Sequence, residues 1–334
     1  MVTAIEPVLR RQLIDRRQKL VSASSVFHRP AELTRLLDEV DSALQRMDDG
    51  IYGLCEVCHD PVETERIIAN PTERFCIDHL TVNQQRALEE DLQLAAQIQS
   101  TLLPPPTRTG DGWEVAYHYQ PAGPVSGDYC DLINGEKNSL YFVLGDVSGK
   151  GVAASMLMAH LHAMFRTLAS INMPLEQMVE RASRVFCEST LPTQYATLVC
   201  GKAAADGGVE ICNAGHLPAL LTQRGDVTQI AATGLPVGMF CSESFSVTKF
   251  RMQPGDSLLL YTDGCSERSN SDGQEYGTDR LSEMLRAEPT LSPRPLLEHG
   301  LRQIEIFAQG NAPVDDVTLM AIQRIHIVDA QDRN

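Results

Sequence analysis

Four aspartates in short motifs rich in small residues are the side chains best suited to carry chemistry in this 334-residue chain. They are Asp128, Asp146, Asp263 and Asp316, and each adjoins an apolar run. Hard cations such as Mg²⁺ and Mn²⁺ prefer carboxylate oxygens, often together with backbone carbonyls. Neighbouring glycines let the backbone approach such an ion closely. The four motifs therefore predict one metal site assembled from distant strands.

The strands that lead into two of these aspartates support a shared site. A single Asp-Gly or Gly-Asp pair is more often a turn than a metal ligand. Here, however, the apolar run 140–144 leads into Asp146, and the run 257–261 leads into Asp263. Carboxylates at strand ends can converge on one cleft, so we expect the aspartates to lie together.

The bulk composition limits the classes of function. Forty-four acidic and twenty-eight basic residues give a net charge of −16. This charge argues against binding of nucleic acid or anionic membrane through the whole surface, although it leaves room for a local basic patch. Basic residues interrupt the first twenty positions, and we find no signal peptide or membrane span. We expect a cytoplasmic protein of about two domains.

Nine cysteines are distributed unevenly, with three between positions 55 and 76 and six scattered singly. This distribution fits a reducing cytoplasm with one metal cluster better than a disulfide framework. The cluster is Cys55, Cys58, Cys76 and His79, with His59 as a nearby competitor for the fourth position. Two ligand pairs with short internal gaps are typical of a closed structural Zn²⁺ site, which holds a small fold together and does not catalyse.

The segments around these motifs predict a helical first part and a mixed second part. Two helices are expected in the first fifty residues, separated at Pro30 and stopped at Asp48–Gly50. A third is expected over 78–103, where Pro104 ends it. Its seam suits either packing on its own domain or a homodimer contact, and consists of Leu88, Leu92, Ala95, Gln99 and Leu102.

The composition changes after the prolines to short apolar strands divided by Gly, Asn and Asp. Two helices are evident among these strands, over 153–170 and 175–189. One mixed domain of helices and strands follows. We therefore divide the chain into a hairpin with a zinc finger over 1–80, a linker helix over 81–103 and a single domain over 104–328.

The cysteine cluster resembles the zinc finger of the DksA/TraR family. The resemblance covers roughly residues 33–80 and rests on GIYGLCEVC at 50–58, RIIANP at 66–71 and CIDH at 76–79. Members place the finger beside a helical hairpin and bind RNA polymerase. The hairpin here is short, and the Ser22–Arg29 turn has no acidic pair resembling the family's functional tip. The finger is therefore interpreted as a regulatory or interaction module.

Residues 88–325 resemble SpoIIE/RsbU-type serine/threonine phosphatases of the metal-dependent protein phosphatase family. Eight motifs recur in the family's order: IQSTLLP (98–104), SGDYCD (126–131), GDVSGKG (145–151), YATL (195–198), NAGH (213–216), GLPVG (234–238), YTDG (261–264) and DDVT (315–318). The resemblance implies an α+β fold, an α-β-β-α sandwich of two stacked sheets with helices outside. It also implies two Mn²⁺ or Mg²⁺ ions, which would activate a shared water and neutralise charge on the phosphoryl oxygens.

The resemblance also implies unequal roles for the aspartates. Asp146 would bridge both ions, Asp128 and the Val147 carbonyl would serve one, and Asp263 and Asp316 would serve the other. The choice of Asp316 over its neighbour rests on resemblance alone.

Other residues near these motifs receive supporting roles. Asp131 and Asp315 are interpreted as supporting or turn residues beside the ligands. Ser126 and Cys130 stand where the family often has glycine and an aromatic residue, and both changes leave the proposed ligands intact.

The histidines and the glycine-flanked lysine are not assigned catalytic roles. His118 and His216 are interpreted as loop or packing histidines in preference to general acids. The spacing around Lys150 excludes a Walker loop, which needs four residues between its glycines and Ser or Thr after the lysine.

The sequence as a whole favours a bacterial regulatory phosphatase acting on phosphoserine or phosphothreonine in a small protein. By resemblance, the substrate is a phosphorylated anti-sigma-factor antagonist, and the N-terminal module senses an unknown activating partner or controls dimer geometry. Two alternatives stay open. One is an RNA polymerase-binding regulator with a secondary or inactive phosphatase domain, and the other is a two-metal phosphoesterase for small molecules.

Overall fold

The chain divides into two compact units, with the division after Glu90. The computed structural model describes residues 2–24, 30–80 and 82–326. Within these ranges, every helix is too short or too polar to span a lipid bilayer.

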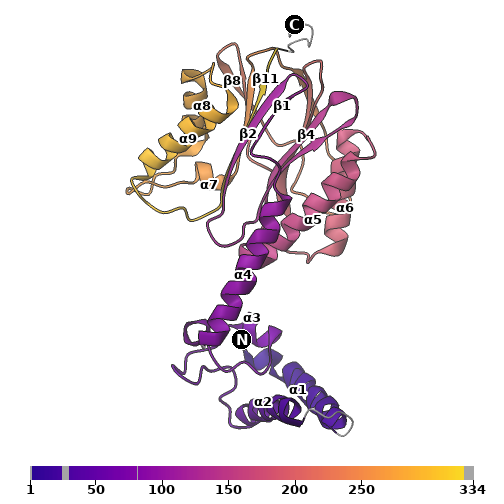
Figure 1. Ribbon diagram of the computed structural model, residues 1–334, viewed down its shortest axis with the longest axis vertical. Coiled ribbons are helices and arrows are strands. Elements are labelled where there is room, and N and C mark those ends of the chain that lie inside the picture. The colour runs from indigo at the N-terminus through magenta and orange to yellow at the C-terminus, as the bar shows by residue number, and fades with distance from the viewer. Residues whose placement is uncertain (1, 25–29, 81, 327–334) are drawn as a thin grey trace, which may run out of the picture. The chain divides into compact units, whose positions relative to one another are not determined.

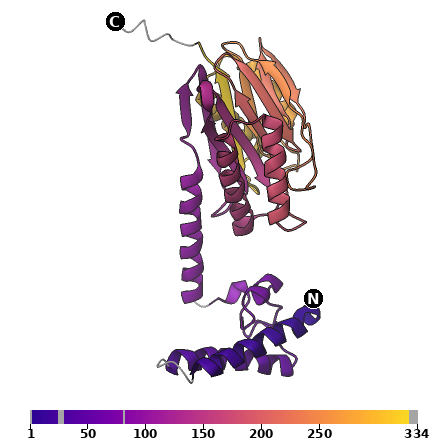
Figure 2. The same ribbon diagram turned by 90° about the vertical axis from the view of Figure 1, so that its right-hand side faces the viewer.

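A helical hairpin begins the first unit. It consists of α1 (Val2–Ser24) and α2 (Pro30–Asp48), which lie side by side in Figure 2. Leu9 and Leu13 of α1 are buried with Val40 and Ala43 of α2 in one cluster. Helix α2 begins at Pro30, where the missing N–H costs no helical hydrogen bond. Both predicted helix boundaries are confirmed, whereas most of the Ser22–Arg29 turn lies outside the described residues.

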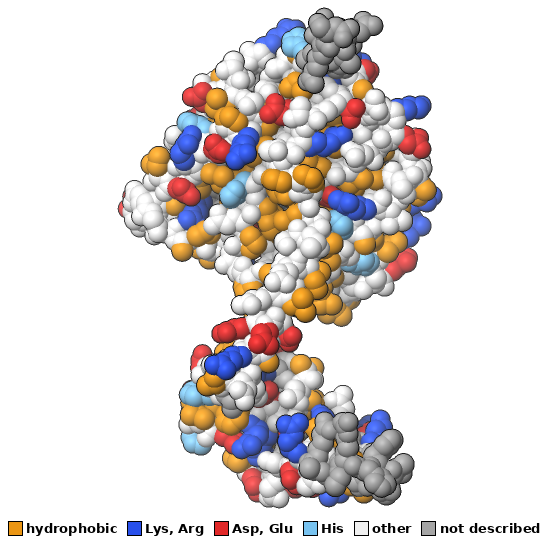
Figure 3. All heavy atoms as spheres, viewed as in Figure 1, with side chains coloured by type: hydrophobic (Ala, Val, Ile, Leu, Met, Phe, Trp, Pro, Cys, Tyr) orange, Lys and Arg blue, Asp and Glu red, His pale blue; other side chains and the backbone are white. Residues whose placement is uncertain are grey.

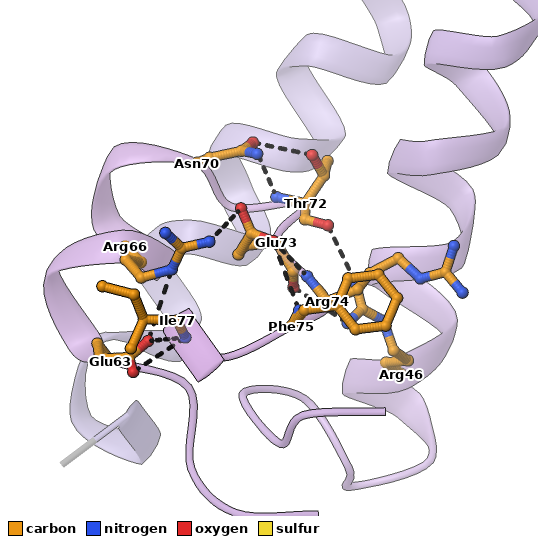
Figure 4. Close-up of polar contacts among 9 residues, drawn as sticks. All are labelled: Arg46, Glu63, Arg66, Asn70, Thr72, Glu73, Arg74, Phe75 and Ile77. Atoms are coloured by element: carbon orange, nitrogen blue, oxygen red, sulfur yellow. Dashed lines mark hydrogen bonds and ion pairs between the residues drawn. The ribbon is translucent and has the colours of Figure 1, made fainter. Parts of the chain in front are cut away.

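The zinc-finger segment folds onto the end of α2 through a buried guanidinium. Arg46 is 6% exposed and donates hydrogen bonds to the carbonyls of Glu73 at 3.1 Å and Thr72 at 3.3 Å, as Figure 4 shows. Arg66 of the short helix α3 (Thr64–Ala69) forms an ion pair with Glu73 at 3.2 Å. The segment after α3 is thus held by α2 through Arg46 and by α3 through Arg66.

Helix α4 (Val82–Leu102) follows and contains the division between the units. The prediction of a helix over 78–103 is confirmed, except that residues 77–79 form a separate 3₁₀ turn. Pro104 follows two residues after the helix ends.

Two stacked antiparallel sheets form the centre of the second unit. The six-stranded sheet has the order β1 (Thr107–Gly110), β2 (Trp113–Gln120), β11 (Val317–Arg324), β10 (Ser257–Tyr261), β7 (Ala219–Gln223) and β8 (Asp226–Ile230). The five-stranded sheet has the order β3 (Asp128–Asn134), β4 (Leu140–Val147), β5 (Ala196–Ala203), β6 (Gly208–Ala214) and β9 (Thr248–Arg251).

Helices cover the outer face of each sheet, as Figure 1 shows. Helices α5 (Gly151–Ala169) and α6 (Leu175–Ser189) pack on the five-stranded sheet. Helices α8 (Gly277–Ala287) and α9 (Pro293–Ala308) pack on the six-stranded sheet, and α7 (Asp263–Ser266) is a single short turn. The α-β-β-α sandwich is therefore confirmed. Helices α5 and α6 match the helices predicted over 153–170 and 175–189, whereas α8 and α9 were not predicted from the sequence.

The lone tryptophan lies in the core between the two sheets. Trp113 is fully buried, and its indole Nε1 donates a hydrogen bond to the Ala204 carbonyl at 3.0 Å. The guanidinium of Arg324 lies 5.0 Å from the centre of its ring.

Gly201 of β5 makes room for another core aromatic, because a Cβ there would lie 2.0 Å from Phe142. Burying an aromatic side chain of this size contributes about 1.5–3 kcal/mol.

A disulfide joins two of the six cysteines that are scattered singly along the sequence. Cys187 in α6 is bonded to Cys241, 54 residues later, in the segment before β9. That segment also contacts α6 through Gly238, whose N–H donates a hydrogen bond to the Ser183 hydroxyl at 3.1 Å. The sequence pattern, interpreted as one metal cluster in preference to a disulfide framework, did not predict this pair, and the other seven cysteines are free. Distance along the chain did not reveal that the segment folds back on α6.

Charged side chains of both signs are interspersed over the second unit on the face shown in Figure 3. Pairs such as Lys249 with Glu210 at 2.6 Å and Arg251 with Asp206 at 2.8 Å follow the same pattern. Exposed pairs of this kind contribute little to stability. They do reduce the strength of any single-sign field over that unit.

Candidate metal centre

Asp128 and Asp146 lie opposite each other on the paired strands β3 and β4. Asp128 is 1% exposed, and its Oδ2 accepts hydrogen bonds from the hydroxyls of Thr262, at 3.0 Å, and Thr318. These threonines stand at the ends of β10 and β11, so Asp128 connects the two sheets. Burial raises its pKa well above the usual range for a carboxyl group.

Asp146 and Asp263 line one pocket of 380 Å³, which Ser148, Thr197 and Glu267 also line. Burial raises the pKa of Asp146 to about 7, and the charges of Asp263 and other nearby aspartates add to the effect. Burial also raises the pKa of Asp263. Partly buried carboxylates that repel one another in this way are stabilised by a cation. The residues present therefore fit a divalent metal ion.

Gly127 keeps space beside two of the predicted ligand atoms. A Cβ at this position would lie 3.1 Å from the Val147 carbonyl oxygen and 3.4 Å from Asp146 Oδ1. A side chain would crowd both oxygens at the mouth of the site. Steric crowding therefore disfavours any larger residue at this position, independently of turn geometry.

The two adjacent aspartates before β11 point to different partners. The Asp316 carboxylate accepts hydrogen bonds from Ala122 N–H at 2.7 Å, the Ser126 hydroxyl at 2.7 Å and Gly127 N–H at 3.0 Å. Both of its oxygens are therefore used to hold the loop before β3. Asp315 instead forms an ion pair with Lys150 at 2.8 Å and raises the pKa values of Asp146 and Asp263 by its charge.

Ser126 connects this loop to helix α4. Its hydroxyl donates to Asp316 and accepts from Asp128 N–H at 3.0 Å. Its backbone is held by Gln99, whose Nε2 donates to the Ser126 carbonyl at 2.7 Å and whose Oε1 accepts from the Ser126 N–H at 3.0 Å. Gln99 is 6% exposed. Sequence analysis placed it on a packing seam, where helical periodicity gave no indication of this polar contact.

The rest of the seam on α4 behaves differently at its two ends. Leu102 packs against the core formed by α5, α6 and the five-stranded sheet. Leu88 is 39% exposed. The last turns of the helix therefore pack on the second unit, and a homodimer contact through the earlier part stays a prediction.

Of the two candidate histidines, His216 lines the pocket of Asp146 and Asp263, and both its ring nitrogens have protein partners. His216 is buried, its Nδ1 lies 2.8 Å from the Thr197 hydroxyl, and its Nε2 lies 3.0 Å from the Tyr261 carbonyl. Because a carbonyl can only accept, Nε2 carries the proton. Burial lowers the pKa of His216 to about 4. His118 is half-buried on β2, where it contacts Gln120.

Asp131 anchors helix α5 to strand β3. It is fully buried, and Arg166 of α5 donates two hydrogen bonds to it, at 2.9 and 2.8 Å. Paired bonds from one guanidinium to one carboxylate fix both distance and orientation. Asp131 therefore supports the helix that follows the Asp146 motif.

Cys55, Cys58, Cys76 and His79 form a compact cluster in the first unit, with all four ligand atoms within 4.8 Å of one another. Cys58 Sγ lies 3.7 Å from Cys76 Sγ, which lies 3.1 Å from His79 Nδ1. Among the described residues, this is the one set of three or more such side chains gathered closely enough to hold an ion. His59 lies outside the set, and the aspartates of the second unit are not gathered as closely.

Comparison with known proteins agrees with the fold and the motifs. The family described as Stage II sporulation protein E (SpoIIE) matches residues 136–325, which is more than half of the chain. The protein therefore belongs to the SpoIIE family. The prokaryotic dksA/traR C4-type zinc finger matches residues 50–78. The fourth ligand position here is His79 in place of a cysteine.

Several curated or solved proteins are similar to this chain. Protein IcfG of Synechocystis is 26% identical over 70% of the chain, and phosphoserine phosphatase RsbU of Bacillus subtilis is 24% identical over 72%. The chain spans 41% of the length of IcfG and 72% of that of RsbU. The crystal structure of the RsbU and RsbW domains of Rv1364c from Mycobacterium tuberculosis is 27% identical, with a TM-score of 0.57, and the match covers 68% of this chain and 62% of that one.

Gln99→Leu tests the link between α4 and the aspartate loop. The substitution leaves the buried N–H and carbonyl of Ser126 without partners, so we expect the free energy of unfolding to fall by about 1–3 kcal/mol. We also expect faster hydrogen exchange at the Ser126 amide. Urea denaturation and amide exchange measure the two effects. Gln97→Leu, at an exposed position of the same helix, is the control, and equal exchange in the two variants would contradict the link.

Proposed function

We propose that the protein is a metal-dependent protein-serine/threonine phosphatase, a phosphoric monoester hydrolase. The observation that carries this proposal is the pocket shared by Asp146 and Asp263, whose pKa values are raised by burial and by neighbouring carboxylates. Membership of the SpoIIE family and similarity to RsbU, which is named a phosphoserine phosphatase, support the reaction type.

The chain's own oxygens would hold two Mn²⁺ or Mg²⁺ ions. Asp146 would bridge them, Asp128 and the Val147 carbonyl would serve one, and Asp263 would serve the other. When bound, such ions supply Lewis acidity for attack of water on phosphorus. The protein positions the oxygens: Thr262 and Thr318 orient Asp128, as described above.

For the remaining ligand, we propose Asp315 in place of Asp316. Three protein donors already occupy both oxygens of Asp316. The charge of Asp315 raises the pKa of Asp263 more than any other side chain does, and it raises the pKa of Asp146 more than the charge of Asp316 does. Asp316 would then shape the loop that positions Asp128.

Family membership supports the proposed substrate class more than the pocket does. We propose a serine-phosphorylated protein, in particular an anti-sigma-factor antagonist. The similarity to RsbU and RsbP, both named phosphoserine phosphatases, supports phosphoserine as the group that is hydrolysed. Turnover of a serine-phosphorylated peptide against that of metabolite phosphates separates the two classes.

Asp146→Asn tests the reaction. Replacing one oxygen of the bridging carboxylate should lower Mn²⁺-dependent turnover of p-nitrophenyl phosphate and of a phosphoserine peptide about hundredfold or more. Asp226→Asn, at an exposed position of β8, should leave turnover unchanged. Equal activity of Asp146→Asn and the wild type would rule out the proposed mechanism.

Asp315→Asn and Asp316→Asn separate the two neighbouring aspartates. We expect Asp315→Asn to weaken Mn²⁺ binding in calorimetric titration while stability to urea stays close to that of the wild type. Asp316→Asn should instead lower the free energy of unfolding, because an amide nitrogen faces donors where a carboxylate accepted them. The reverse pattern would restore Asp316 as the ligand.

We infer that the Cys55, Cys58, Cys76 and His79 cluster holds one structural Zn²⁺ and that the first unit regulates the phosphatase. The compact geometry and the zinc-finger match support the metal. The same finger type supports a second candidate for its partner, RNA polymerase. A polymerase pull-down that survives Asp146→Asn but fails with Cys58→Ser would favour that candidate.

Cys58→Ser tests the zinc site. We expect the variant to lose the bound zinc and part of the helical signal of the first unit, because structural zinc contributes directly to folding. His59→Asn, which changes the competing histidine while tolerating its positive φ of 60°, should retain the metal. Atomic absorption and circular dichroism measure both properties. Retention of zinc by Cys58→Ser together with loss by His59→Asn would reassign the ligands.

A further inference from the structure

Lys150 stands in a turn between β4 and α5 that two glycines make adaptable. Gly149 has φ +102° and Gly151 has φ +71°, values that L side chains rarely adopt. A Cβ on either glycine would meet nothing within 4 Å. The glycines therefore serve backbone geometry and not close packing.

The ammonium of Lys150 contacts the acidic edge of the pocket directly. Its Nζ lies 2.8 Å from Asp315 Oδ2 and donates a hydrogen bond to the Val314 carbonyl at 3.1 Å. The Lys150 side chain is 66% exposed, and that of Asp315 is 41% exposed. Among the described residues, no other lysine or arginine forms an ion pair with Asp315, Asp146 or Asp263.

We propose that Lys150 and the divalent metal ion compete for the carboxylate of Asp315, so that Lys150 sets the metal affinity of the site. This inference rests on the proposed function, because it requires Asp315 to be a metal ligand. A divalent ion must approach a carboxylate oxygen to about 2.0–2.6 Å. An ammonium group on the other oxygen of the same carboxylate would then face a doubly charged neighbour, and the two cations repel.

The surroundings of Lys150 allow such an exchange. An exposed side chain can leave Asp315 for solvent without breaking core packing, and the flanking glycines let the turn adjust. The Val314 carbonyl offers the ammonium a neutral acceptor close to its present position. Metal binding would thus convert an internal ion pair into a free lysine at the rim of the pocket.

Lys150→Met tests the competition by metal affinity and not by activity alone. We expect the full-length variant, stripped with a chelator, to bind Mn²⁺ about two- to fivefold more tightly than the wild type in calorimetric titration, the range expected for an exposed ion pair. Lys249→Met is a matched control, because Lys249 pairs with Glu210 at 2.6 Å and is 67% exposed. Its affinity should equal that of the wild type. Unchanged or weaker binding by Lys150→Met would overturn the proposal.

A second measurement distinguishes displacement from the general effect of removing a positive charge. We expect the side-chain ε-CH₂ resonance of Lys150 to move, on titration with Mg²⁺, to its position in the Asp315→Asn variant. A resonance that stays in place while Mg²⁺ saturates the site would mean that the ion pair persists, and the proposal would be wrong. Failure of the wild type to bind Mn²⁺ or Mg²⁺ at all would instead overturn the proposed metal centre.

Discussion

The demand of the partly buried Asp316 carboxylate for hydrogen-bond donors is the constraint on which the aspartate-bearing end of the sandwich depends. Asp316 lies just before β11 of the six-stranded sheet, and its donors come from the loop that leads into β3 of the five-stranded sheet. Leaving a partly buried carboxylate without these partners would cost about 1–3 kcal/mol. The two sheets are therefore held in one relative position at this end. This also fixes where Asp128 and Asp146 of the five-stranded sheet lie relative to the six-stranded sheet.

The sequence predicted those parts of the fold that local chemistry decides. Proline and glycine marked the ends of α2 and α4, and apolar periodicity marked α5 and α6. Helices α8 and α9 were missed, because α8 is short and α9 begins with two prolines and contains Gly300. That glycine lies against Met284 of α8, so tertiary packing explains a residue that local propensity disfavours.

The candidate site was predictable in residue type but not in orientation. Adjacent residues before a strand point to different sides, and only the folded chain shows that Asp316 faces a loop while Asp315 faces Lys150. The polar role of Gln99 and the bond between Cys187 and Cys241 likewise depend on segments far apart in sequence. Spacing along the chain carries no information about such encounters.

The position of Trp113 gives the molecule a built-in optical reporter. It is the single tryptophan of the chain, and it is sealed between the two sheets beneath the Arg324 guanidinium. Intrinsic tryptophan fluorescence therefore reports on the interior of the sandwich and not on the first unit. Melting of the two units can be followed separately, with indole emission for the sandwich and absorbance of a metal such as Co²⁺, substituted at the thiolates, for the finger.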